Sequence, residues 1–125
     1  MSNVDTVREI YAAFGRGDIP GVLSHFAADI DWQAPASVFG DKGSARGPEG
    51  VGAFFGSLPS YFPELRVETK ELIDGGDTVV ALGTHTGRGA KGSFQADFAH
   101  VWRLKDGAAT SFHEVADTAT ITAAL

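Results

Sequence analysis

The chain contains 125 residues, of which 43% are hydrophobic and 21% charged, and this composition is typical of one globular domain with its own core. The formal net charge is -6 and the basic residues are scattered, which excludes the basic surface that nucleic acid binding requires. The absence of cysteine excludes disulfides and thiolate metal ligands and is compatible with a reducing cytoplasm. Because no apolar run approaches the ~20 residues of a membrane span, and the charged N-terminal segment is unlike a signal peptide, we expect a cytoplasmic protein without a membrane partner.

The first half of the chain is predicted to be mainly helical. Apolar residues recur at helical spacing over residues 3–15, and a second, short helix over residues 18–26 can be capped by its first residue. A brief strand is expected at residues 30–33. Residues 34–47 are rich in glycine, serine and alanine and are expected to form a loop. A third helix begins at Pro48 and is expected to end at Pro59.

The second half of the chain is predicted to form strands. Four segments rich in β-branched and aromatic residues are separated by turn residues, and they span residues 65–73, 77–87, 93–104 and 108–121. Helices followed by an antiparallel meander indicate an α+β fold, in which the helices pack on one face of a curved sheet. We expect a single domain over residues 1–125.

The turn at Asp106-Gly107 decides which side chains share a face of the last hairpin. A two-residue turn places His100 opposite His113, whereas a three-residue loop with a glycine bulge places His100 opposite Phe112. The second register puts His100 and Glu114 on the same side, because a shift of one residue exchanges the faces. We favour it, since it gathers the large apolar residues of the hairpin on the side that meets the helices.

The opposite face of this hairpin is half apolar and is predicted to be free of helices. It holds Ala99, Val101, Ser111, His113 and Val115. A flat surface of this kind on an open sheet face is typical of a contact with a second subunit, so we expect a homodimer through this face.

Two segments resemble a known family. YAAFGRGDIPGVLSHFAADIDWQAP (residues 11–35) and HVWRLKDGAATSFHEVADTA (residues 100–119) are similar to the hallmarks of SnoaL-like proteins in the nuclear transport factor 2-like superfamily, and the first also resembles the ketosteroid isomerases. The resemblance implies a cone-shaped, cystatin-like α+β fold in which three helices and a curved antiparallel sheet enclose a deep, mostly apolar pocket. It further implies a hydrophobic, oxygenated small molecule as partner and cofactor-free proton transfer, as in isomerisation or aldol-type cyclisation.

The resemblance also implies roles for individual residues. Tyr11 matches the oxyanion-hole tyrosine of the ketosteroid isomerases, but Ala34 stands where those enzymes have their general-base aspartate, which argues against their mechanism. His100 and Glu114 match the acid–base pair of SnoaL-type polyketide cyclases, with glutamate in place of aspartate. A neighbouring carboxylate raises the pKa of an imidazole, so we expect His100 to transfer the proton, Glu114 to orient and charge it, and Tyr11 to donate to an oxygen of the ligand.

Aromatic residues are the predicted lining of the pocket, although aromatics at such spacings are also ordinary core residues. They are Trp32, Phe39, Phe54, Phe55, Tyr61, Phe62, Phe98, Trp102 and Phe112.

Each functional interpretation has a structural alternative. His100 and Glu114 can be a buried hydrogen-bonded pair that only fixes the sheet register, and the Tyr11 ring can simply pack in the core. The whole domain can then be a non-catalytic ligand-binding or assembly module. His85 lies between Gly83 and Gly87, which obscure the buried face of its strand. No histidine or carboxylate spacing predicts a metal site, and no cofactor is expected.

Overall fold

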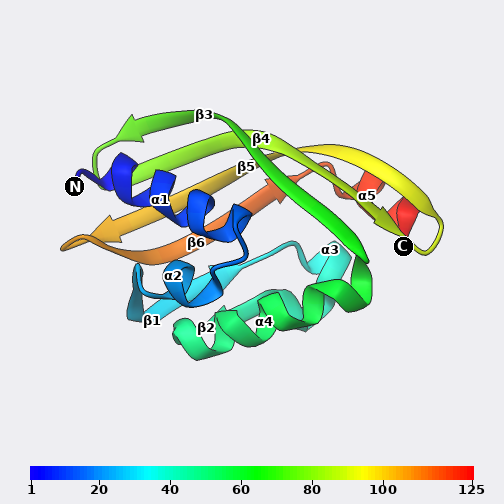
Figure 1. Cartoon of the computed structure of the whole chain (residues 1–125), viewed down its shortest axis with the longest axis horizontal. Helices are drawn as coiled ribbons and strands as arrows, with labels where there is room; N and C mark the ends of the chain where they lie inside the picture. Colours follow the sequence, from blue (N-terminus) through cyan, green and yellow to red (C-terminus); the bar gives the residue numbers. More distant parts are fainter.

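The computed structural model describes residues 1–125 (Figure 1). Its first two helices lie where the sequence predicts helices. Helix α1 (Asn3–Gly15) begins at a capping box, in which the Ser2 hydroxyl accepts from the Asp5 N–H and the Asp5 carboxylate accepts from the Ser2 N–H. Helix α2 (Ile19–Leu23) is capped by the Asp18 carboxylate. It ends earlier than predicted, because Phe26 is already the first residue of a strand.

The strands form one six-stranded sheet in the order β2-β1-β6-β5-β4-β3. Their bounds are β1 (Phe26–Gln33), β2 (Ser44–Arg46), β3 (Glu64–Gly75), β4 (Thr78–Gly89), β5 (Gly92–Lys105) and β6 (Ala108–Ala116). The predicted antiparallel meander is confirmed as β3 to β6. In addition, β1 lies parallel to β6, and β2 extends the sheet antiparallel to β1.

The segment predicted as a loop after β1 contains regular structure. It forms α3 (Ala36–Phe39), a 3₁₀ turn called η1 (Gly40–Gly43), and then β2. The prediction of a loop over residues 34–47 is therefore wrong. Each of these elements is only three or four residues long, too short for the periodicity of hydrophobic residues to indicate it.

Two helices differ from the prediction at their ends. Helix α4 (Gly47–Tyr61) continues through Pro59, where the proline removes one backbone donor only within the last turn. The predicted last strand ends at Ala116, and helix α5 (Thr118–Ala124) follows it. Asp117 caps α5 by accepting from the Thr120 N–H, so an aspartate that looked like part of a strand is a helix start signal.

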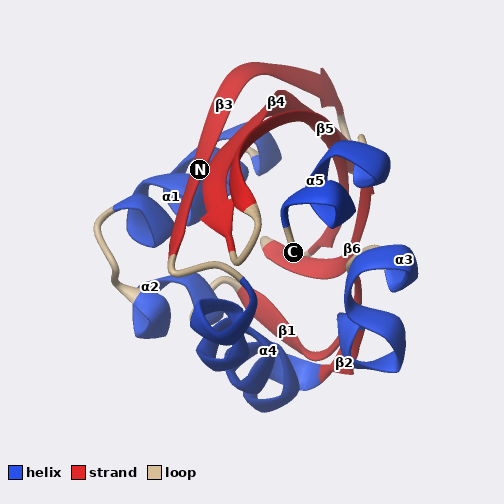
Figure 2. Ribbon diagram, turned by 90° about the vertical axis from the view of Figure 1, so that its right-hand side faces the viewer, coloured by secondary structure: helices blue, strands red, loops and turns tan.

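The sheet is strongly curved, and the helices lie on its concave side. Figure 2 shows α1, α2 and α4 along one side of the curve and α5 within it at one end. The main core forms where α1, α2 and α4 meet β1, β5 and β6, and a second cluster joins α5 to β5. The expected α+β arrangement of helices on a curved sheet is confirmed.

The β5–β6 hairpin has the predicted sidedness but not the predicted turn. Asp106 and Gly107 both have positive φ (52° and 80°), which makes a two-residue turn of the type that favours Asp-Gly. The bulge lies instead within β6, where Thr110 has no partner between the paired residues on either side. As a result His100 pairs with Glu114 rather than Phe112, although all three point to the concave side as expected.

The convex face of the hairpin is solvent-exposed in the single chain. Val115 is 57% exposed there and His113 is exposed, whereas Ala99, Val101 and Ser111 are half-buried. The homodimer itself stays a prediction.

None of the helices combines the length and the apolar character needed to cross a bilayer.

Candidate functional site

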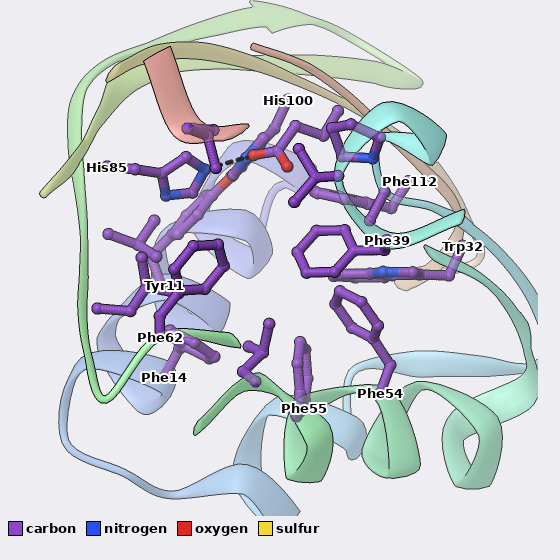
Figure 3. Close-up of a pocket in the computed structure, with 18 of the residues that line it drawn as sticks. Tyr11, Phe14, Trp32, Phe39, Phe54, Phe55, Phe62, His85, His100 and Phe112 are labelled. Atoms are coloured by element: carbon purple, nitrogen blue, oxygen red, sulfur yellow. Dashed lines mark hydrogen bonds and ion pairs between the residues drawn. The ribbon is translucent and has the colours of Figure 1, made fainter. Parts of the chain in front are cut away.

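A cavity of about 90 Å³ lies between the helices and the concave face of the sheet (Figure 3). It is hollow, since one water molecule requires only ~10–15 Å³. Of its 22 lining residues, 18 are hydrophobic. Seven of the nine predicted aromatic residues line it, namely Trp32, Phe39, Phe54, Phe55, Phe62, Trp102 and Phe112.

The other two predicted aromatics do not line the cavity. The Phe98 ring stacks on His100 with 3.9 Å between ring centroids and fills the space beside Gly83, which has no side chain. Tyr61 packs its edge against Phe39 and joins the smaller core cluster near α5. Both assignments were wrong because sequence spacing gives the buried face of an element but not the depth of a side chain within the core.

Residues from outside the predicted set complete the wall. Phe14 comes from α1, Leu65 and Val67 come from β3, and Ile121 comes from α5. Ile121 could not be expected there, because its segment was predicted as a strand. Its contribution shows that the C-terminal helix helps to close the cavity.

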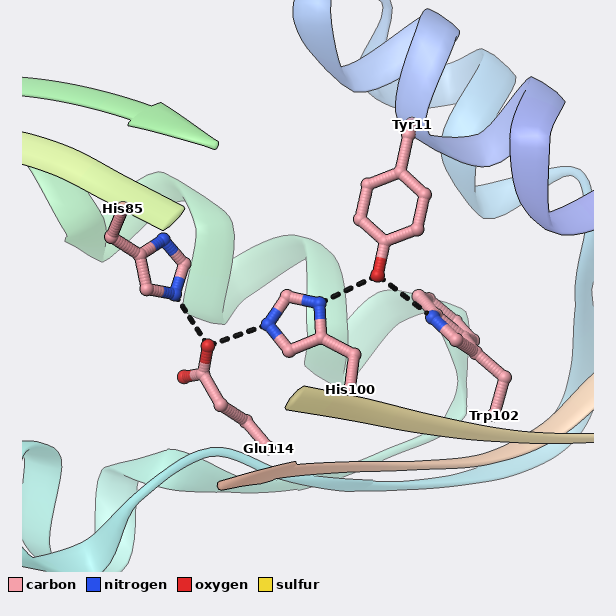
Figure 4. Close-up of polar contacts among 5 residues, drawn as sticks. All are labelled: Tyr11, His85, His100, Trp102 and Glu114. Carbon is pink, nitrogen blue, oxygen red and sulfur yellow. Dashed lines mark hydrogen bonds and ion pairs between the residues drawn. The ribbon is translucent and has the colours of Figure 1, made fainter. Parts of the chain in front are cut away.

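The floor of the cavity holds one polar group built on three adjacent strands (Figure 4). Glu114 on β6 places a single oxygen, Oε2, 2.5 Å from Nε2 of His100 on β5 and 2.5 Å from Nε2 of His85 on β4. The side chains of His85, His100 and Glu114 are 11%, 5% and 9% exposed. The predicted pair of His100 and Glu114 is therefore in contact, and His85 is a third member that the sequence left open.

Tyr11 connects this group to helix α1. Its hydroxyl lies 2.5 Å from Nδ1 of His100 and accepts from Nε1 of Trp102 at 2.9 Å. The sequence predicts that the Tyr11 hydroxyl donates to an oxygen of the ligand, whereas in the structure this hydroxyl bonds to His100 and Trp102. The result is a continuous chain of hydrogen bonds from the indole to the carboxylate.

Burial and hydrogen bonding set the charges of the group. Burial alone would raise the pKa of Glu114, but the hydrogen bonds from His100 and His85 outweigh it and lower that pKa to about 2. Burial lowers the pKa of His100, and the hydrogen bond to Glu114 offsets this only in part. Burial likewise raises the pKa of Tyr11 above its ordinary value, against the effect of the Trp102 hydrogen bond. At neutral pH the carboxylate is ionised, His100 is neutral and Tyr11 keeps its proton.

The net pKa direction at His100 differs from the sequence prediction. A neighbouring carboxylate does raise the pKa of an imidazole, but desolvation of this buried ring is the larger effect. The sequence indicated the partner of His100 but not the depth at which the pair lies. His100 is therefore a neutral hydrogen-bonding ring in the resting site.

The glycines on either side of His85 obscure the buried face of its strand in the sequence, and the sheet register explains why they are there. Gly83 pairs with Phe98 and Gly87 pairs with Phe94 across β4 and β5, and each aromatic ring occupies the space that a glycine leaves. Both glycines face the same side as His85. The sequence contains a signal for the position of His85. Its strand alternates glycine with one histidine, and the following strand alternates phenylalanine with alanine, which indicates that the rings pack over the glycines on the face that His85 shares.

Two buried polar atoms on the lining residues have no hydrogen-bond partner. They are Nε1 of Trp32 and Nδ1 of His85. A buried donor or acceptor without a partner costs roughly 1–3 kcal/mol, so such atoms are uncommon and are typical of binding or catalytic sites. Both are therefore candidates for contact with a bound molecule.

His85, His100 and Glu114 are also the residues that could hold a metal ion. Their ligand atoms lie within 4.8 Å of one another. However, both Nε2 atoms lie at hydrogen-bonding distance from the same oxygen, whereas ligand atoms around a tetrahedral zinc ion are roughly 3.3 Å apart. The side chains would have to separate to admit an ion, so the observed arrangement is that of a hydrogen-bonded group.

The fold and the site define a class of small α+β proteins with an apolar pocket and a polar group at its floor. The SnoaL-like domain family matches residues 7–112, and the chain belongs to this family. A comparison with curated protein sequences finds no match. The resemblance to SnoaL-like proteins of the nuclear transport factor 2-like superfamily is thereby confirmed.

Solved structures agree with this assignment. An NTF2-like protein of unknown function from Burkholderia pseudomallei is 38% identical with a TM-score of 0.91, over 99% of this chain and 98% of that one. TerC, crystallised with polyporic acid, is 30% identical with a TM-score of 0.89, over 98% and 96%. IdmH from Streptomyces antibioticus, a proposed polyketide cyclase, is 20% identical with a TM-score of 0.82, over 98% and 97%, and supports the fold alone.

Proposed function

We propose that the protein catalyses cofactor-free proton transfer on a hydrophobic, oxygenated small molecule bound in this cavity. The observation that carries the proposal is the carboxylate of Glu114 shared by two imidazoles at the floor of an apolar space. An ionised carboxylate fixes the tautomer of a histidine and stabilises the imidazolium that forms when the ring takes a proton. Isomerisation and aldol-type cyclisation are two reactions that use this chemistry.

The shape of the cavity supports the kind of ligand. The aromatic rings of Trp32, Phe54 and Phe55 line the cavity, and the imidazoles of His85 and His100 lie at its other end. Such a lining binds an apolar body and directs its oxygen functions toward the few polar groups. The 30% identical TerC, crystallised with polyporic acid, makes that compound the first ligand to test.

Ligand binding can be measured through the protein's own fluorescence. Trp32 and Trp102 are the two tryptophans of the chain, and both line the cavity. A molecule that enters the cavity should therefore change the emission of the whole protein. We expect polyporic acid to do so with saturation, and Phe55→Ala to weaken the binding.

Proton transfer can be measured with 2-tetralone, a bicyclic ketone with acidic C–H bonds beside its carbonyl. We expect the protein to accelerate deuterium exchange at these positions in D₂O, followed by proton NMR. Glu114→Gln should lower the rate roughly 10²-fold, the scale of a general acid–base contribution. His113→Gln, a change on the exposed face of the same strand, is the matched control and should keep the wild-type rate. Saturable binding without faster exchange would instead identify a non-catalytic binding module.

A further inference from the structure

The two histidines of the site differ in how their nitrogens are used. Both nitrogens of His100 are occupied, because Nε2 bonds to Glu114 and Nδ1 bonds to Tyr11, each at 2.5 Å. His85 uses Nε2 for Glu114 at 2.5 Å, and its Nδ1 is buried without a partner. Figure 4 shows the two rings on either side of the carboxylate.

The charge of Glu114 decides the positions of the protons. An ionised carboxylate only accepts hydrogen bonds, so both Nε2 atoms must carry a proton. In neutral His100 the remaining nitrogen, Nδ1, is then an acceptor, and it receives the hydroxyl proton of Tyr11. The corresponding Nδ1 of His85 has no hydrogen-bond partner, so it is the one ring nitrogen of the two histidines that no protein group occupies.

We infer that His85, through Nδ1, is the group that takes the proton from the bound ligand, and that His100 positions Glu114 and Tyr11. This inference rests on the proton-transfer function proposed above and assigns the reacting group within it. A proton can reach Nδ1 of His85 without breaking any bond of the resting site. The same proton could reach His100 only after Tyr11 or Glu114 had let go of its ring.

Glu114 supports His85 in the way a carboxylate supports a catalytic imidazole. It holds the ring by its Nε2–H and carries the negative charge that balances an imidazolium. Because the pocket is apolar, the charge pair that forms on protonation is favoured over an isolated charge. Ala96 is the residue opposite His85 on β5.

The substrate class follows from the unpartnered atom of His85. Its Nδ1 requires an acidic proton. A ketone with acidic C–H bonds beside its carbonyl provides one. In the step, that C–H bond breaks, an N–H bond forms at Nδ1 of His85, and the electron pair moves to the carbonyl oxygen as an enolate. Return of a proton from Nδ1 to carbon completes the turnover. In D₂O the N–H exchanges with solvent before this return, so the carbon receives deuterium and no further reactant is needed.

Deuterium exchange into 2-tetralone, compared among variants, tests the assignment. We expect His85→Ala to lower the rate roughly 10²- to 10⁴-fold and added imidazole to restore it with saturation, because the free base fills the space of the lost ring. His100→Ala should also be slow, but imidazole should not restore its rate, since the ordered Tyr11 contact is lost as well. His113→Ala is the control for imidazole catalysis in solution. Exchange in folded His85→Ala at the wild-type rate would overturn the inference, while slow exchange in Glu114→Gln would leave the proposed function standing.

Nitrogen NMR of the unaltered protein gives a second, independent readout. In ¹⁵N-labelled protein, Nδ1 of His85 should be unprotonated, and 2-naphthol, a planar phenol, should shift this signal by donating to it. The Nδ1 signal of His100 should move far less. A protonated Nδ1 in His85, or a shift confined to His100, contradicts the inference. Absence of exchange in the wild-type protein together with the His85 shift would overturn the proposed reaction but keep the ligand contact.

Discussion

The two faces of the β5–β6 hairpin carry the same kinds of residue in opposite environments. On the concave face, His100 is 4% exposed and bonds to Glu114 and Tyr11. On the convex face, His113 is exposed and makes no side-chain hydrogen bond or ion pair, and Val115 is 57% exposed. The comparison shows that an imidazole becomes a site residue through its burial and its partners, and that the register of one hairpin decides which histidine receives them.

Removal of the Glu114 carboxylate should give the largest difference in stability loss between a substitution on the concave face and one on the convex face. Glu114→Ala leaves the N–H groups of His85 and His100 buried without an acceptor, so we expect a loss of about 2–5 kcal/mol in the free energy of unfolding. His113→Ala on the convex face should change it by less than about 0.5 kcal/mol. Urea unfolding followed by circular dichroism measures both, and similar losses would mean that the concave group does not hold the sheet together.

A methyl group on the concave face should be the next most harmful change. A Cβ at Gly83 would collide with the Glu68 carbonyl and lie 2.6 Å from the Phe98 ring, so Gly83→Ala should cost about 1–3 kcal/mol. Thr86→Ala, on the exposed face of the same strand, should be nearly neutral. The midpoint of thermal unfolding distinguishes them, and an unchanged midpoint for Gly83→Ala would show that the strands can separate at this point.

The free energy of unfolding should decrease in acid because of two titratable groups on the concave face, His100 and Glu114. The pKa of His100 is lowered in the folded protein, so the unfolded chain binds more protons below its ordinary value near 6.5. This stability is fully present above that value and is lost as the pH falls toward the folded pKa. Below pH 4.5, Glu114 adds a second loss that continues toward its folded pKa of about 2.

A comparison of the wild-type protein with the His100→Gln variant isolates the contribution of His100 to this pH dependence. The urea concentration at the midpoint of unfolding should decrease in the wild-type protein as the pH is lowered from 7.5 to 5. The decrease per pH unit should be smaller in His100→Gln, which has no imidazole at this position. We expect the change over this range to be smaller than the loss in Glu114→Ala. Equal slopes in the two proteins would mean that another group dominates the acid sensitivity.

The features of the two faces that could be predicted from the sequence are those that short stretches of residues determine. Strict alternation along β5 places Phe98, His100 and Trp102 on one face, and helical spacing with a serine cap gives α1. The placement of His100 and Glu114 on the same side of the hairpin followed from gathering its large apolar residues on one side, although the predicted partner of His100 was Phe112. In each case residues within about fifteen positions of one another carry the information.

The parts that were not predictable depend on contacts between distant segments. The parallel pairing of β1 with β6 joins segments about 80 residues apart, and no local signal marks it. The bulge at Thr110 compensates for the two-residue turn, so two errors in the expected hairpin cancelled in its sidedness. His85 joined the site because β4 lies beside β5 in a register set by the turn that connects them. Such features are fixed by packing, which one-dimensional spacing describes only in part.

The smallest expected effect on stability lies on the convex face and concerns assembly. Val115→Asp alters an exposed residue, so the unfolding free energy of a monomer should change by less than about 0.5 kcal/mol. If the convex face forms the homodimer that the sequence predicts, the same change places a charge within an apolar contact and should convert the dimer to a monomer. Sedimentation velocity of both proteins over a range of concentrations measures this. A wild-type protein that sediments as a monomer throughout would refute the predicted dimer and leave the concave site unaffected, because no residue of that site lies on the convex face.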